Sequence, residues 1–223
     1  MSGRKEARLN SGLPDAIGTR TYNLVMCGVL AYGFLLNAVL VYYFAEPLMV
    51  ALRGTSPWIL LAGYLVCTLA GIMIAARSRN AMVSFLGYNL VVLPIGVMLA
   101  LMLPQFPAQT VVKAMGLTGM VTLTMMVLAV TFPQMFLGLW RTLFVALLAG
   151  LVAEVVATFV FGYRGVLFDW LFVIIFSGYI GYDVSRSQAY PKTLDNAVDC
   201  AIDIYLDIIN LFIRILSLLS RSE

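Results

Sequence analysis

Aspartates concentrate near the end of the chain, at spacings suited to proton or cation chemistry. Of the eleven acidic residues, five fall in one stretch: Asp183, Asp195, Asp199, Asp203 and Asp207. The last three recur every four residues, so on a helix they form one stripe, which Asn210 and Arg214 continue. A charged side chain at the centre of a membrane helix costs about 3 kcal/mol, so such residues usually face a bundle interior and have a partner or a function.

Asp183 and Asp207 are predicted to face one another across a helical hairpin. Pro191 should end the first helix near Tyr190, which leaves Asp183 about two turns inside it, while Asp207 lies about three turns into the next helix. Two close carboxyls in a low-dielectric interior cannot both ionise cheaply, so the pair is expected to share one proton. When protonated, the pair holds the helices together. When deprotonated, the carboxylates separate or attract a cation, and oxygen ligands favour calcium.

Other polar residues near this pair have both structural and functional interpretations. Asp195 and Asp199 lie near a helix start, where acids cap amide groups and complement the helix dipole. Arg186, one turn after Asp183, gives that carboxyl a structural partner. The residues predicted to support the pair are Asp203, Tyr182, Asn210, Arg186 and Glu154. The role of Asp203 stays undecided, and Glu154 is either an interior hydrogen-bonding group or a second relay site.

The elements that must position these residues are membrane helices. The chain of 223 residues is 62% hydrophobic and only 11% charged, whereas a soluble domain is roughly half apolar and a quarter charged. A hydrocarbon core about 30 Å thick needs roughly 20 apolar residues per helix. Seven spans are expected, at residues 22–44, 58–76, 81–103, 109–130, 136–161, 166–190 and 196–219. Proline or charge marks the breaks between them: Glu46-Pro47, Arg53-Gly54, Arg77 to Asn80, Pro104 to Pro107, Pro133, Tyr163 to Gly165 and Pro191-Lys192.

The predicted fold is therefore an all-α membrane protein. Residues 22–219 are expected to form a single seven-helix transmembrane domain, preceded by a polar cytosolic tail (1–21) and followed by a C-terminal tail (220–223). Histidine is absent, so any pH sensing must use carboxylates. The three cysteines, Cys27, Cys67 and Cys200, lie in apolar stretches without metal-ligand spacing, which argues against a zinc site or a disulfide framework.

Basic residues predict a multi-pass protein of the inner (plasma) membrane with its N-terminus in the cytosol. The cytosolic side would collect the four tail cations and four others along the chain: Arg4, Lys5, Arg8, Arg20, Arg77, Arg79, Arg186 and Lys192. The opposite side would hold mainly Arg53, Arg164 and Arg221. Anchoring explains the tail cations more simply than nucleic-acid binding does. If the last segment re-enters instead of crossing, the C-terminus returns to the cytosol.

Two segments, SGYIGYDVSRSQ and AIDIYLDIINLFIRILSLLS, resemble the C-terminal signature of the transmembrane Bax inhibitor motif family, bacterial type. In that family a Tyr-Asp on helix six precedes a Leu-Asp-x-Ile-Asn-Leu-Phe run on helix seven. The likeness extends more loosely over residues 22–219, through the number of spans, the Arg-Ser-Arg turn after span two and the glycine-threonine run at 116–118. The resemblance implies six helices around a central seventh.

The same resemblance implies a pH-sensitive calcium leak. Asp183 and Asp207 match the family's ion-binding and pH-sensing aspartates, and Arg77 matches its latch arginine, although an arginine at the end of a span is usually an anchor. Many members also carry an acidic residue midway along span two, whereas residues 61–76 contain none, which leaves the selectivity of the ion path open. A bacterial branch is instead associated with restraining a membrane-bound AAA protease.

Three functions therefore compete. The first is a proton-gated cation leak whose partners are the bilayer, protons and calcium, with calcium at the Asp183 and Asp207 pair as the one expected cofactor. The second is a non-transporting regulator that binds a membrane protease complex through its basic tail and lipid-facing surface. The third is an intramembrane aspartyl protease. Bulky Ile204-Tyr205-Leu206 precedes Asp207 where such enzymes need glycine, so an enzyme is not expected.

Overall fold

The computed structural model describes residues 15–162 and 165–221. The predicted tail up to residue 14, Arg164 and the last two residues lie outside this part of the chain. Within the described residues the protein is helical, with a single isolated antiparallel bridge between Ala16 and Thr193. Six described helices are long and apolar enough to cross a membrane: α2 (Thr19–Ala51), α3 (Pro57–Arg77), α4 continued by a 3-10 turn (Ala81–Gln105), α5 (Ala108–Thr131), α7 (Trp140–Phe161) and α8 (Val166–Ala189). The protein is therefore an all-helical, multi-pass membrane protein.

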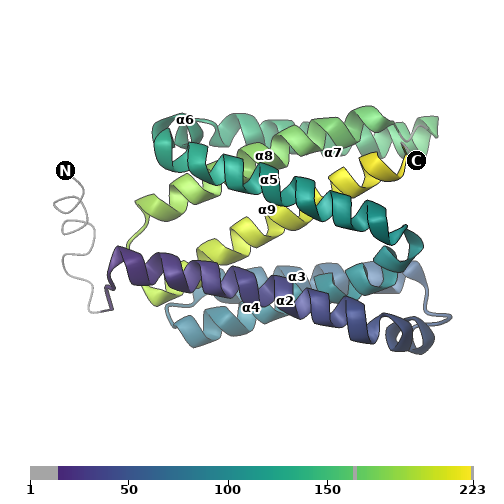
Figure 1. Cartoon of the computed structure of the whole chain (residues 1–223), viewed down its shortest axis with the longest axis horizontal. Helices are drawn as coiled ribbons and strands as arrows, with labels where there is room; N and C mark the ends of the chain where they lie inside the picture. The colour runs from purple at the N-terminus through teal and green to yellow at the C-terminus, as the bar shows by residue number, and fades with distance from the viewer. Residues whose placement is uncertain (1–14, 163–164, 222–223) are drawn as a thin grey trace. The chain divides into compact units, whose positions relative to one another are not determined.

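The chain divides into two compact units. The first unit runs to Gln105 and includes Tyr190–Asp203, and the second comprises Phe106–Ala189 and the chain from Ile204 onward. In the first unit, α2 and α3 both pack on α4 (Figure 1). Helices α3 and α4 meet at Gly71 and Gly87, where a methyl group on Gly71 would lie 2.5 Å from the Gly87 carbonyl oxygen. Only glycine permits this backbone approach.

In the second unit, α8 is the helix against which the others pack. Helices α5 and α7 and the short α6 (Pro133–Gly138) all contact α8. Gly181 of α8 lies directly against the ring of Phe136 from α6, leaving no room for a side chain. Gly150 of α7 similarly faces Phe172 of α8, at 3.3 Å from where a methyl carbon would lie. Close contacts between a glycine and an aromatic ring thus pack α8 against both α6 and α7.

Helix α9 (Leu194–Ser220) contributes to both units and differs from the six apolar helices. Its first turn carries Asp195, and no residue from Asp195 to Ser220 is exposed. With four aspartates and one arginine, α9 is not among the six candidate spans of the described residues. The expectation that it crosses the membrane as a central seventh helix, and that residues 22–219 form one domain, stays a prediction.

Two predicted helix boundaries were wrong. The break expected at Glu46-Pro47 does not occur, because α2 continues through Pro47 to Ala51. Proline removes one backbone hydrogen bond, but the helix is kept by the next ones, including that from the Leu52 amide to the Leu48 carbonyl oxygen at 2.9 Å. The fifth span begins at Trp140, later than expected, because Pro133 starts the separate helix α6.

Candidate functional site

Asp183 of α8 and Asp207 of α9 are brought together in the second unit. A hydrogen bond joins their side chains. Each residue is buried, with 8% of its surface exposed. Because a carboxylate has no proton to donate, a hydrogen bond between two carboxyl groups requires that one of them be protonated. The two carboxyls therefore lie together, as predicted from the helical hairpin, and their role in ion binding and pH sensing stays a prediction.

Two neighbours on α8 surround the pair. A guanidinium nitrogen of Arg186 lies 3.8 Å from Asp183 Oδ1, and its side chain is 38% exposed, so this ion pair is long and partly solvated. Tyr179, one turn before Asp183, is close enough to interact electrostatically with both Asp183 and Asp207. Arg186 was predicted as a neighbour of the pair, whereas sequence reasoning did not select Tyr179. Its one-turn spacing from Asp183 is the signal that identifies it.

The remaining predicted site residues occupy several places. Tyr182 is half-buried on α8, and the Asn210 side chain donates to the backbone oxygen of Leu206 at 2.8 Å. Asp203 is half-buried on the part of α9 that belongs to the first unit. Arg77 is the exposed last residue of α3, also in the first unit. Its role as a latch stays a prediction.

The aspartates at the start of α9 have a more specific setting than helix capping. The hydroxyl of Thr193 makes the capping bond, accepting from the Asn196 amide at 3.1 Å. The Asp195 carboxylate instead accepts a 2.6 Å hydrogen bond from Ser84 of α4, whose side chain is fully buried. Asp199, one turn further along α9, also lies beside Ser84, but the single hydroxyl proton can be donated to only one carboxylate at a time. The hydrogen bond to Asp195 therefore attaches the start of α9 to α4.

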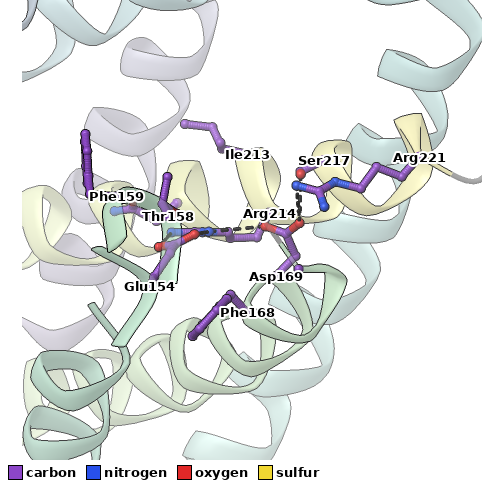
Figure 2. A pocket seen from close by; sticks show the side chains of 11 residues that line it. Glu154, Thr158, Phe159, Phe168, Asp169, Ile213, Arg214, Ser217 and Arg221 are labelled. Atoms are coloured by element: carbon purple, nitrogen blue, oxygen red, sulfur yellow. Dashed lines mark hydrogen bonds and ion pairs between the residues drawn. The ribbon is translucent and has the colours of Figure 1, made fainter. Parts of the chain in front are cut away.

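A second polar cluster lies in the second unit, around Arg214 of α9 (Figure 2). The Arg214 guanidinium donates to both carboxylate oxygens of Glu154, at 2.6 and 2.8 Å, in the bidentate arrangement that favours strong pairing. It also donates to Asp169 Oδ1 at 3.2 Å and lies 4.2 Å above the ring of Phe172. One arginine thus connects α7, α8 and α9.

Asp169 is the most buried member of this cluster, with 3% of its surface exposed. In addition to Arg214, its carboxylate accepts from the Ser217 hydroxyl at 2.8 Å and lies 3.5 Å from a guanidinium nitrogen of Arg221. A cavity of about 450 Å³ adjoins the cluster, and its lining includes Glu154, Asp169 and Arg214. Two carboxylates and two guanidinium groups make the cluster electrically balanced.

Sequence reasoning found only part of this cluster. Glu154 was predicted as a supporting residue of the aspartate pair, but the partner that the structure gives it is Arg214. Arg214 was recognised only as the continuation of the aspartate stripe, and Asp169 was not selected. The available signal was charge: Arg214 lies deep in an otherwise apolar segment and requires an acidic partner, and Glu154 and Asp169 are isolated acids in neighbouring spans.

The fold and these clusters define a multi-pass helical membrane protein with ionisable groups held inside a bundle. A family model described as inhibitor of apoptosis-promoting Bax1 matches residues 15–223. The chain therefore belongs to this Bax inhibitor family, which confirms the resemblance found in its C-terminal segments.

Bacterial membrane proteins are among the relatives of the chain. An uncharacterized membrane protein of Streptococcus pyogenes serotype M1 is 27% identical over 214 residues, which cover 92% of each chain. An uncharacterized membrane protein of Vibrio cholerae serotype O1 is 34% identical over 110 residues, 49% of this chain and 48% of that protein. The chain thus spans about half the length of the Vibrio protein in this match, and nearly the full length of the streptococcal one.

Proposed function

We propose that this protein is a proton-gated leak for cations, with Asp183 and Asp207 as its ion-binding and pH-sensing pair. The observation that carries the proposal is the hydrogen bond between these two buried carboxyls. With a shared proton, the two carboxyls are hydrogen-bonded to each other and α8 and α9 stay joined. Loss of that proton leaves two negative charges in one buried place, which either push the helices apart or bind a cation.

Calcium is the cation that we propose for this pair, because carboxylate, carbonyl and water oxygens are its preferred ligands. A stable calcium site uses about six to eight oxygen atoms, more than two aspartates supply. A pair of carboxylates completed by water and backbone oxygens therefore suits brief binding during passage, because conduction needs a site that the ion can leave.

We place the protein in the bacterial inner membrane with its N-terminus in the cytosol. Arg77 at the end of α3, Arg79 between α3 and α4, and Arg186 near the end of α8 would then all lie on the cytosolic side, as the positive-inside rule requires. In this orientation Asp183 lies in the cytosolic half of α8, and Asp169 lies near its opposite end. The leak would therefore run along α8, with the aspartate pair nearer the cytosol.

Calcium flux into liposomes tests the proposal. Purified protein is reconstituted in vesicles that contain a calcium dye, and calcium is added outside at values from about pH 5 to pH 8. Flux is expected to rise with pH, as the shared proton is lost. Asp183→Asn and Asp207→Asn should each abolish this pH response, because an amide neither titrates nor binds calcium as a carboxylate does.

Asp15→Asn is the matched control, since Asp15 is an exposed acid before α2 and should leave flux and its pH response unchanged. Absence of flux at every pH, or an unchanged pH response in both pair variants, would overturn the proposal. No flux, together with copurification of a membrane protease, would instead support the non-transporting regulator.

A further inference from the structure

We infer that Arg214 is the residue that controls cation access along α8 and α9 from the end opposite Arg186. This inference rests on the proposed cation leak, whose path it extends beyond the aspartate pair. Arg214 is held by Glu154 and Asp169, beside the cavity shown in Figure 2. None of these three residues is needed for the chemistry of Asp183 and Asp207.

Helix periodicity places the two clusters on a common face. Asp169 and Asp183 are about four turns apart on α8, and Asp207 and Arg214 are about two turns apart on α9. Residues separated by whole turns lie on the same side of a helix. The side of α8 that carries Asp183 therefore also carries Asp169, and the side of α9 that carries Asp207 also carries Arg214. One polar face thus joins the aspartate pair to the cluster, over about 10 Å along α9.

Arg214 is a fixed positive charge on this face. Its guanidinium stays protonated at all physiological pH values, unlike a lysine or histidine side chain. Two short hydrogen bonds to Glu154, a third to Asp169 and the ring of Phe172 keep it in place. Without this charge, the carboxylates of Glu154 and Asp169 would attract a cation that approaches Asp207 from this end. Arg214 therefore raises the barrier for cations specifically, by cancelling that attraction.

The balance of charge around Arg214 makes the effect adjustable in both directions. With Glu154, Asp169 and Arg221, the cluster is neutral. Removing Arg214 would leave one net negative charge, which attracts cations. Removing the charge of Glu154 would leave one net positive charge, which repels them. The cavity beside the cluster, lined also by the polar residues Thr158 and Asn210, has room for water and for a small cation.

Thiol modification at position 207 tests this inference without relying on calcium flux. Asp207→Cys is introduced into a full-length protein whose native cysteines, Cys27, Cys67 and Cys200, are changed to alanine. The reconstituted protein is treated with a cationic or a neutral methanethiosulfonate reagent of similar size, and modification is followed by mass. The ratio of the two modification rates reports whether the path to position 207 favours or repels a positive charge, whereas general loosening of the fold raises both rates together.

Arg214→Gln is expected to raise the ratio of cationic to neutral rate about tenfold, as one charge at this distance predicts. Glu154→Gln should lower the ratio by a similar factor. Arg214→Lys, which keeps the charge, should leave it near the starting value. Arg141→Gln is the matched control, because Arg141 of α7 lies over the Trp140 ring, outside the cavity lining; its ratio should not change.

The inference is overturned if Arg214→Gln and Glu154→Gln leave the ratio unchanged or move it in the same direction, or if neither reagent reaches position 207. If Arg214→Gln fails to fold, Glu154→Gln decides the question by the sign of its effect. The two proposals fail separately. A shifted ratio without calcium flux in the unmodified protein would retain Arg214 as the access residue and remove the calcium leak. A pH-dependent calcium flux with an unchanged ratio would retain the calcium leak and remove Arg214 as the access residue.

Discussion

The two polar clusters of the second unit lie on the same pair of helices but are built differently. Asp183 and Asp207 are like groups, and the hydrogen bond between them depends on a shared proton. Arg214, Glu154 and Asp169 are opposite charges in short contact, with Ser217 completing the set. The first cluster can therefore change with pH, whereas the second is held by attraction between opposite charges.

This difference separates a region that responds to pH from a region with one fixed arrangement. Two buried carboxyls have two arrangements, with and without the shared proton. The free-energy difference between them is small enough for a change of pH to reverse which one is favoured. A half-buried arginine between two carboxylates has one good arrangement, because removing any partner leaves a charge unpaired. We therefore expect the ion-pair cluster to dominate stability and the aspartate pair to dominate pH dependence.

The largest expected effect is the loss of stability in Arg214→Gln. Without Arg214, the carboxylates of Glu154 and Asp169 face each other without the guanidinium that binds both. Breaking a fully buried ion pair from one side costs about 3–5 kcal/mol, and because Arg214 and Glu154 are partly exposed we expect about 2–3 kcal/mol here. The unfolding free energy in detergent, measured by SDS titration, should fall by that amount.

Arg141→Gln provides the comparison for this measurement. Arg141 undergoes the same chemical change, but it is exposed and lies over the Trp140 ring. Exposed substitutions of this kind usually change stability by no more than about 0.5 kcal/mol. Equal losses in the two variants would show that the cluster contributes no more than a surface charge, and the contrast between the two regions would disappear.

Much of the fold could be predicted from sequence, because a bilayer imposes helices of a known length. Four of the six candidate spans start and end within about two residues of apolar runs bounded by charge or proline. The helix break predicted at Pro47 was wrong because proline removes only one backbone hydrogen bond, and the neighbouring hydrogen bonds keep α2 helical. The extra helix α6 was missed because six residues are too few to show a period.

The site divides in the same way. Asp183 and Asp207 were found because they lie on consecutive helices, where a tight turn dictates which residues become level. The partners of Arg214 were not found, because Glu154 and Asp169 come from two other helices, and their rotation about the helix axis depends on packing. Gly150 against Phe172 is one such contact between α7 and α8, and no spacing rule within one helix predicts it.

The next effect concerns the pH dependence of stability, which Asp207→Asn should remove. Both aspartates of the unfolded chain release their protons above about pH 4. The native pair keeps a shared proton, so the folded state binds more protons and stability falls as pH rises, by up to about 1.4 kcal/mol per pH unit. The contribution is complete in acid and lost as the native pair deprotonates.

Thermal unfolding in detergent between about pH 5 and pH 8 measures this slope. In Asp207→Asn the amide can donate to Asp183 at every pH, so the slope should vanish while stability at high pH rises. Asp15→Asn, an exposed change outside the helices, should keep the slope of the unmodified protein. A slope that survives Asp207→Asn would mean that another group, such as Asp199, supplies the pH response.

The smallest effect is expected in Ser217→Ala, which tests how far the ion-pair cluster depends on its neutral member. The Ser217 hydroxyl donates to Asp169 at 2.8 Å, but Arg214 and Arg221 remain on the same carboxylate after its removal. Loss of one hydrogen bond to a charged group should therefore cost about 1–2 kcal/mol, measured by the same SDS titration.

Ser220→Ala is the control, because that hydroxyl donates to a backbone oxygen of its own helix, that of Ser217. A loss in Ser217→Ala as large as that in Arg214→Gln would contradict the view that opposite charges, more than hydrogen bonds, hold this cluster together.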